Sequence, residues 1–257
     1  QEFKDARAAG RKDDDLLNIV RKVIALKHAK NKDGMDTITE ACDVAQKNCV
    51  QHKSVGYNTA RSVILGRLHL VQNGSGYAIE EVYCQRDFGR DDFGKAPYPG
   101  PDVIPNHAVV NVEHTWPQSK FNRRFDSGMQ KSDLHHLFPT DSEMNSVRGN
   151  FNFGDVEKDV RVLKCPTSRF GYIGQTRDHF FEPPAAHKGN VARALFYFSV
   201  RYMIPIKSIE EEALKRWNKL DPVDQAERDR NDRIQQIQGN RNPFIDYPEL
   251  TDSVSNF

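Results

Sequence analysis

The 257-residue sequence predicts an α+β fold, mostly helical around a small β-sheet. Apolar residues recur at helical spacing near both ends of the chain, which is typical of amphipathic and buried helices. The segments 77–84 and 108–114, the second rich in β-branched residues, indicate strands between them. We find no internal repeat, so we expect one domain over 1–257, with a helical N-terminal extension at 1–50.

The composition excludes a membrane protein and leaves a polyanionic partner open. Charge is balanced, with 37 Lys and Arg against 36 Asp and Glu, so a nucleic-acid surface would be a local patch. Mean hydropathy is −0.72, and the most apolar run, 194–200, is far shorter than the roughly 18 residues of a membrane span. The first twenty residues lack the basic and apolar segments of a signal peptide, which fits either a cytosolic protein or a processed, mature one.

The first third of the chain reads as helices followed by a strand. The segment "DLLNIVRKVIALKHA" has helical periodicity, and "TITEACDVAQKNC" opens with Thr37 and Thr39 as candidate caps. The apolar segment "SVGYNTARSVILGRLHLV" predicts another helix, which the turn sequence "QNGSG" ends, and "YAIEEVYC" suits a strand. Residues 86–107 are rich in Gly, Pro and Asp and predict a long loop.

Four cysteines fit either two disulfides or buried free thiols. No C-x-x-C pair occurs, which disfavours a zinc ribbon. Cys42 with Cys49 would close a short loop and leave Cys84 with Cys165. The count alone does not decide between the alternatives.

A strand, a strand and a helix follow one another in the middle of the chain. "AVVNVEH" at 108–114 predicts the first strand, and the alternation at 134–138 predicts a second one that Pro139 stops. Thr140 and Glu143 then form a capping box, so a helix should begin with Thr140 as its N-cap. Asn145 and Arg148 lie three residues apart and therefore share one face of that helix.

The last third of the chain predicts helices and a wrapping tail. "GNVARALFYFSVRYM" at 189–203 is apolar nearly all round, which indicates a central buried helix. For 221–240 we expect a helix with Asp221 as N-cap, Pro222 at the first helical position and Gly239 as C-cap. The proline-punctuated segment at 242–257 should wrap the surface.

This order can bring Glu113, His114 and Asn145 together. A carboxylate and an amide oxygen are ligands that suit Mg²⁺, with room left for a phosphate. A neutral histidine can take a proton from an attacking water near neutral pH, so we expect activity to fall below about pH 6 as His114 protonates. Arg148 can contact a phosphate as a fork donor; its alternative role is a surface ion pair with Glu143 or Asp141.

Several other residues are candidates for substrate binding. Lys120, Arg123 and Arg124 belong to a basic loop beside the predicted site, although solvated charge is the default role of such a loop. Asn150 follows the helix, and Arg241 lies in "QGNRNPF", which equally suits a structural turn. His135 and His136 are adjacent on a predicted strand and would point apart, so a shared zinc ion is not expected.

The segment "VEHTWPQS…SDLHHLFPTDSEMNSVRGNF" resembles the ββα-metal (His-Me finger) core of the bacterial endonuclease I family. Further segments are similar to that family in the same order, among them "YNTARSVILG", "AHKGNVARALFYFSVRY" and "LKRWNKLDPVDQAERDRNDRIQQIQGNRNPFIDYPEL". The similarity runs from about residue 57 to 250, with the ββα core at about 107–155.

The resemblance implies a role for each matching residue. His114 would be the general base, and Glu113 and Asn145 would be the ligands of one Mg²⁺, with Mn²⁺ or Ca²⁺ as substitutes. Such enzymes cut DNA, and often RNA, with little sequence preference and leave 5′-phosphate ends. They are secreted or periplasmic, which favours disulfides here. A leaving-group arginine of some relatives would correspond to Arg123 or Arg124.

Two functional alternatives remain beside a monomeric, non-membrane nuclease. The first is a catalytically inactive nucleic-acid-binding relative of the same fold. The second is a metal-dependent hydrolase of another phosphoester. A zincin protease is disfavoured, because neither H-E-x-x-H nor H-x-x-E-H occurs.

Overall fold

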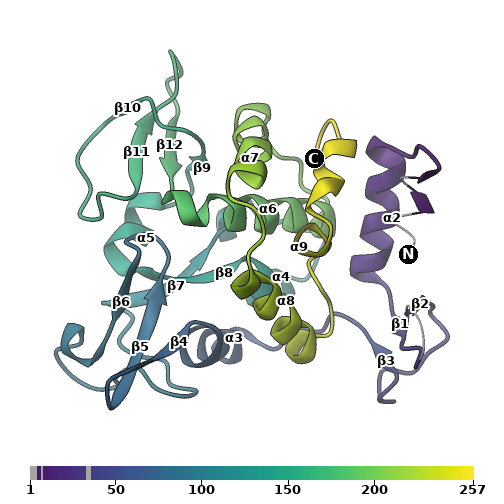
Figure 1. Cartoon of the computed structure of the whole chain (residues 1–257), viewed down its shortest axis with the longest axis horizontal. Helices are drawn as coiled ribbons and strands as arrows, with labels where there is room; N and C mark the ends of the chain where they lie inside the picture. The colour runs from purple at the N-terminus through teal and green to yellow at the C-terminus, as the bar shows by residue number, and fades with distance from the viewer. Residues whose placement is uncertain (1–4, 7, 33–35) are drawn as a thin grey trace.

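The computed structural model describes residues 5–6, 8–32 and 36–257, and parts of the expected N-terminal extension at 1–4, 7 and 33–35 lie outside the described residues. Helices form the middle of the molecule, and small sheets lie toward its two ends (Figure 1). The predicted α+β class is confirmed. No helix within the described ranges is long and apolar enough to cross a membrane.

The N-terminal helix α2 (Asp13–Ala25) is confirmed and packs against the main core. Its buried side chains join the core cluster that also includes α6 (Lys188–Tyr202): Leu16, Leu17, Val20 and Ile24. Arg21 Nε donates to the Val200 carbonyl oxygen at 3.3 Å. The extension is therefore held against the rest of the chain, near the C-terminal segment in Figure 1.

The second helix expected at 37–49 is wrong. This region instead forms a small antiparallel sheet in the order β2-β1-β3, with strands His28–Ala29 (β1), Thr37–Ile38 (β2) and Cys49–Val50 (β3). The Cys42–Cys49 disulfide closes the loop between β2 and β3. Most side chains between these two strands are exposed, so a helix here would have had little apolar surface to bury.

The helix expected over 54–71 is shorter than predicted. It comprises α3 (Tyr57–Val63) and a π-helical turn (Ile64–Leu68), after which the chain enters a sheet in the order β4-β5-β6. The strands of this sheet are Leu70–Asn73 (β4), Gly76–Glu81 (β5) and Arg86–Phe88 (β6). The turn predicted at 72–76 thus lies inside the β4–β5 hairpin, and most of 89–107 is the expected loop.

The ββα unit consists of β7 (Val110–His114), β8 (Leu137–Asp141) and α5 (Ser142–Arg148). The strands are antiparallel, with Val112 opposite Pro139 and His114 opposite Leu137. Pro139 does not stop β8 as expected. The β7–β8 sheet has only two strands, so Pro139 is in an edge strand, where a missing N–H is tolerated, and its carbonyl accepts from Val82 N at 3.2 Å.

The start of α5 differs from the prediction by one residue. The N-cap is Asp141, whose side chain accepts from the backbone N–H groups of Glu143 and Met144. Thr140 is the last-but-one residue of β8, and its hydroxyl donates to Glu81 Oε1 at 3.0 Å. A carboxylate that accepts two N–H groups replaces the hydroxyl cap that the capping-box pattern indicated.

A further sheet follows α5 in the order β10-β11-β12-β9. Its strands are Asn152–Phe153 (β9), Lys158–Asp159 (β10), Arg169–Tyr172 (β11) and His179–Glu182 (β12). The Cys84–Cys165 disulfide joins the loop before β11 to the turn after β5. Both disulfides that the cysteine count allowed are therefore present.

The central buried helix is confirmed as α6. Around it lie α4 (Ser127–Ser132), α7 (Ser208–Leu220), α8 (Gln225–Gln238) and α9 (Pro243–Asp246). Gly239 ends α8 with φ 92°, as expected, but the N-cap is Asp224. Asp221 instead follows α7, and its carboxylate accepts from Gly189 N at the start of α6.

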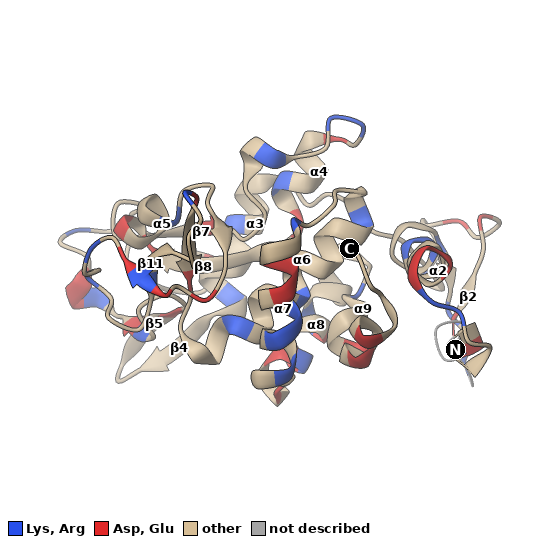
Figure 2. Cartoon of the chain, turned by 90° about the horizontal axis from the view of Figure 1, so that it is seen from above, with Lys and Arg blue, Asp and Glu red and all other residues tan. Residues whose placement is uncertain are grey.

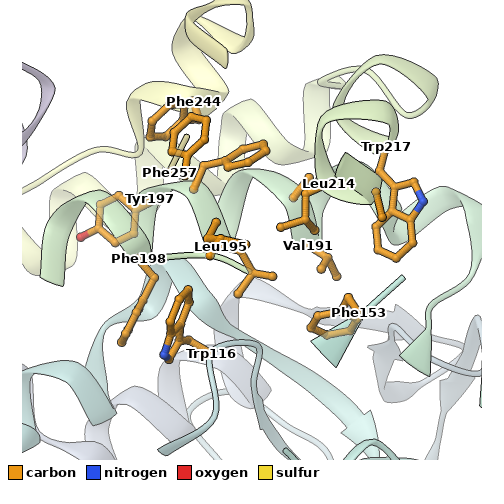
Figure 3. Close-up of a cluster of buried hydrophobic side chains, with 14 of the residues drawn as sticks. Trp116, Phe153, Val191, Leu195, Tyr197, Phe198, Leu214, Trp217, Phe244 and Phe257 are labelled. Carbon is orange, nitrogen blue, oxygen red and sulfur yellow. The ribbon is translucent and has the colours of Figure 1, made fainter. Parts of the chain in front are cut away.

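The C-terminal segment enters the core and does not only wrap the surface. Phe244, Leu250 and Phe257 are buried, and the Phe257 ring centroid lies 4.3 Å from that of Phe196 in α6. Figure 3 shows Phe244 and Phe257 above α6, with Trp116 and Phe153 below it. The helix is therefore covered on both sides, which explains why it is apolar nearly all round.

Candidate active site

The end of β7 opens into a cleft of about 220 Å³ that contains the three central predicted residues. Glu113, His114 and Asn145 all line it, together with Tyr57, Val112, Pro117, Gln118, Ser119, Gly149 and Asn150. Neighbouring residues of a strand point to opposite faces. Because β7 ends at His114, the two side chains reach the cleft from different sides of the strand end.

The Glu113 carboxylate is buried and held by two side chains. Tyr83 donates its hydroxyl to Glu113 Oε1 at 3.0 Å, and Arg148 Nε forms an ion pair with the same oxygen at 3.2 Å. Burial raises the pKa of Glu113, while Arg148 and the Tyr83 hydrogen bond oppose that shift. The buried guanidinium favours the charged carboxylate in a place where burial alone would favour the neutral acid.

His114 is held in one tautomer. Its Nε2 lies 3.1 Å from the Lys131 carbonyl oxygen, which can only accept, so the ring proton is on Nε2. Gln118 Nε2 donates to Nδ1 at 3.3 Å, which again requires an unprotonated Nδ1. The lone pair of the neutral ring therefore faces the side on which Gln118 lies.

Burial lowers the pKa of His114 to about 4, although its bond to the Lys131 carbonyl opposes the shift. Tyr57, Phe121 and His136 surround the ring at centroid distances of 5.3, 6.3 and 5.4 Å. The acid limit expected near pH 6 was based on a solvated histidine, whereas His114 is buried and its pKa is lower.

Asn145 lies in the middle of α5, half-buried at the cleft. Its Nδ2 donates to Asn111 Oδ1 on β7 at 2.6 Å. Asn111 and Glu113 are two residues apart and share one face of β7. That face therefore carries both Glu113 and the partner of Asn145.

Arg148 lies beneath the cleft rather than at its surface. The side chain is 1% exposed, and its Nη2 and Nη1 atoms donate to the carbonyl oxygens of Thr115 at 2.6 Å and Gly149 at 3.1 Å. Its ion pair is with Glu113, whereas Asp141 and Glu143, the partners considered from sequence, pair with Lys164. The guanidinium therefore bonds to the strand end and its carboxylate, and Arg148 is not among the residues that line the cleft.

The predicted basic loop follows the cleft residues 117–119 along the chain. Lys120 is half-buried and donates to Asn152 Oδ1 at 2.6 Å, and burial lowers the pKa of its ammonium. Arg123 and Arg124 are exposed between Lys120 and α4, and Asn150 lines the cleft itself. Figure 2 shows basic residues on α3 and around α4, whereas α7 carries both signs of charge.

Arg241 is not brought to the cleft. It lines a different, larger cavity of about 730 Å³ between α8, α9 and the N-terminal segment. Its guanidinium bonds to both oxygens of Asp246 at 2.8 and 2.6 Å and to Asp232 at 2.5 Å, which raises its pKa further. These contacts support the structural role that the sequence left open. The neighbouring Asn240 is also buried and donates to the Tyr197 hydroxyl.

Both adjacent histidines are packed in the interior. His136 Nε2 lies 2.8 Å from the Gln130 carbonyl oxygen, and His135 Nε2 lies 3.2 Å from that of Asn240. Burial lowers the pKa of each to about 3. The His136 ring makes an edge contact with the His114 ring, while His135 contacts Tyr197 of α6.

Sequence reasoning missed the residues that hold the site. Tyr83 lies thirty residues before Glu113, and Asn111 reads as an ordinary polar position of a strand. Gln118 lies in the segment "VEHTWPQS", and its position four residues after His114 could have indicated the contact. The other two contacts depend on long-range packing, for which the sequence carries no local pattern.

Comparison with known proteins identifies relatives of this chain. A family model described as Endonuclease I matches residues 100–249. The chain is 38% identical over 165 residues to the extracellular ribonuclease of Bacillus subtilis (strain 168), a match covering 56% of this chain and 53% of that protein. It is 29% identical over 168 residues to an extracellular deoxyribonuclease of Aeromonas hydrophila, covering 65% and 59%.

A longer match links the chain to the endonuclease-1 of Buchnera aphidicola subsp. Baizongia pistaciae (strain Bp), with 30% identity over 223 residues, 81% of this chain and 90% of that protein. The chain spans about half the length of the Bacillus relative. The family model nevertheless covers more than half of the chain and includes the whole ββα unit. The chain therefore belongs to the Endonuclease I family.

Proposed function

We propose that this protein is a secreted or periplasmic endonuclease that hydrolyses phosphodiester bonds of DNA, and also of RNA, to leave 5′-phosphate ends. The convergence of Glu113, His114 and Asn145 on one cleft carries the proposal. The family supports the reaction class, and the names of relatives, extracellular ribonuclease and extracellular deoxyribonuclease, support both substrates and the location.

The residues present fit one hard divalent cation. Tyr83 and Arg148 both contact Oε1 of Glu113, so the second carboxylate oxygen remains for a ligand. Asn145 uses its Nδ2 on Asn111, so its carbonyl oxygen remains as well. A carboxylate and an amide oxygen form an oxygen-donor set that Mg²⁺ accepts, with water and a phosphate oxygen completing it. When bound, the cation would offset negative charge on the phosphate and on the departing oxygen.

His114 is the proposed general base. Nδ1 accepts a proton from the attacking water, whose oxygen forms the new bond to phosphorus while the bond from phosphorus to the 3′ oxygen breaks. The 3′ oxygen takes a proton from solvent water and leaves as a hydroxyl group. The Lys131 carbonyl keeps the other ring proton on Nε2 and accepts from it throughout. Because the pKa of His114 is lowered to about 4, the ring is neutral and ready at physiological pH.

Asn150 lines the cleft, and Lys120, Arg123 and Arg124 follow the cleft residues 117–119 along the chain, so all four are proposed to contact the substrate backbone. Arg148 is proposed to position Glu113 and the strand end, in line with its buried contacts. Arg241 is left out of the substrate surface. The protein is proposed to act as a monomer.

Cleavage of plasmid DNA, single-stranded DNA and RNA across Mg²⁺, Mn²⁺, Ca²⁺ and EDTA tests the proposal. His114→Ala should lower the rate by about 10²–10⁴-fold, the usual contribution of a general base, with DNA affinity unchanged. His107→Ala, an exposed histidine seven residues earlier, is the matched control and should cut normally. Undiminished cutting by His114→Ala, or in EDTA, would refute the mechanism. Binding of DNA without cleavage by any metal would favour the inactive relative.

A further inference from the structure

The two proposed cation ligands are held by a crossed pair of contacts between β7 and α5. Glu113 on the strand pairs with Arg148 on the helix, and Asn145 on the helix bonds to Asn111 on the strand. Asn111 and Glu113 share a strand face, while Asn145 and Arg148 share a helix face. Each ligand therefore has its partner on the opposite element.

The Asn111 contact matters because a carboxamide has two ends of similar shape and opposite polarity. Only the orientation that presents oxygen to the cleft can bind a cation, and a rotation of 180° would present the NH₂ group instead. At 2.6 Å, Asn111 Oδ1 accepts from Asn145 Nδ2, which fixes the NH₂ group toward β7 and the oxygen away from it. Without the contact to Asn111, the Asn145 amide could turn its NH₂ group toward the cleft, and the affinity of the site for a cation would fall.

We infer that Asn111 is a positioning residue for cation binding, which sets the orientation of the Asn145 amide. The inference rests on the proposed function, because it assigns Asn145 as a ligand. Asn111 does not line the cleft itself, so its effect on the cation passes through Asn145. Partners of metal ligands typically change affinity by about 10–100-fold when removed.

Direct Mn²⁺ binding, measured by electron paramagnetic resonance and calorimetry, is the test, with Mg²⁺ titration of cleavage as a second readout. Asn111→Ala should weaken Mn²⁺ binding at least tenfold and raise the Mg²⁺ concentration for half-maximal rate similarly. The rate at saturating Mg²⁺ should stay within about threefold, since the bound cation selects the amide orientation that presents oxygen. Asn111→Asp keeps the acceptor and should restore binding. Ser146→Ala is the control, an exposed neighbour on α5 whose hydroxyl donates to the Ser142 carbonyl oxygen.

A double variant separates an effect on the orientation of the Asn145 amide from a general disturbance of the site. In Asn145→Asp both ligand oxygens are equivalent, so a rotated side chain still presents oxygen. Adding Asn111→Ala to Asn145→Asp should therefore change Mn²⁺ affinity less than twofold. Wild-type affinity in Asn111→Ala, or an equal loss in both backgrounds, would overturn the inference and leave the nuclease proposal standing. Mn²⁺ binding that needs Asn145 in a protein that cuts nothing would instead refute the nuclease and keep the role of Asn111.

Discussion

Lowering the pH from 7.5 to 5.5 should hardly change the rate at saturating Mg²⁺. An ordinary histidine with a pKa of about 6.5 would be roughly 9% neutral at pH 5.5, whereas one with a pKa of about 4 is roughly 97% neutral. Burial beneath Tyr57, Phe121 and His136 lowers the pKa of His114 to about 4. The expected rate at pH 5.5 is therefore above nine-tenths of that at pH 7.5, rather than about one-tenth.

The assay is initial-rate cleavage of a short duplex from pH 3.5 to 8, with the fold monitored by circular dichroism at each pH. Tyr57→Ala uncovers one side of the His114 ring and should move the acid midpoint up by about one unit, because desolvation is the largest cause of the shift. A wild-type midpoint between 6 and 6.5 would show that the imidazole is solvated or that another group is the base.

Three further perturbations test other parts of the structure. Arg148→Met leaves the buried Glu113 carboxylate without its cation and should cost about 3–5 kcal/mol of unfolding free energy in urea titrations; a loss below 1 kcal/mol would contradict the buried pair. Arg124→Ala should raise KM for DNA, whereas Arg241→Ala should leave KM unchanged. A higher KM in Arg241→Ala than in Arg124→Ala would show that Arg241 contacts the substrate. Burial also lowers to about 3 the pKa of His135, His136 and His187. As pH falls from 6.5 to 3, these histidines are protonated in the unfolded state but stay neutral in the folded state. The free energy of unfolding should therefore decrease across that window by up to about 1.4 kcal/mol per pH unit for each histidine. A urea midpoint that stays constant between pH 7 and 4.5 would contradict this.

Elements with a strong, uninterrupted hydrophobic pattern were predictable. The β-branched alternation in 108–114 gave β7, and the all-round apolar segment 189–203 gave α6. Each segment is buried against many neighbours, and this burial requires a regular pattern of apolar residues that can be read from the local sequence. The proposed ligands Glu113 and Asn145 and the proposed base His114 could also be named from the sequence, because their chemistry is fixed by the residue itself.

Elements decided by pairing with distant segments were not predictable. The strand β8 continues through Pro139 because β7 and Val82 supply its partners, and no local rule shows this. The 37–49 segment has helix-compatible residues, but its strands pair with β1 and its disulfide closes the loop. The proline-rich tail was expected at the surface, although Phe257 packs against α6, because its few aromatic residues give no periodic signal.

The adjacency of Glu113 and His114 follows from the opposite demands that the two side chains make on their surroundings. The proposed ligand must stay charged although it is buried, so it faces the side of β7 where Arg148 supplies a cation and Tyr83 a donor. The proposed base must stay neutral, so it faces the other side, where aromatic rings and a backbone carbonyl surround it and no carboxylate bonds to it within the described residues. A strand alternates its faces residue by residue, which makes a neighbouring pair the shortest way to meet both demands at one strand end. Moving either residue by one position would put the carboxylate among the rings or the imidazole beside Arg148. Each exchange disfavours the protonation state that the reaction needs.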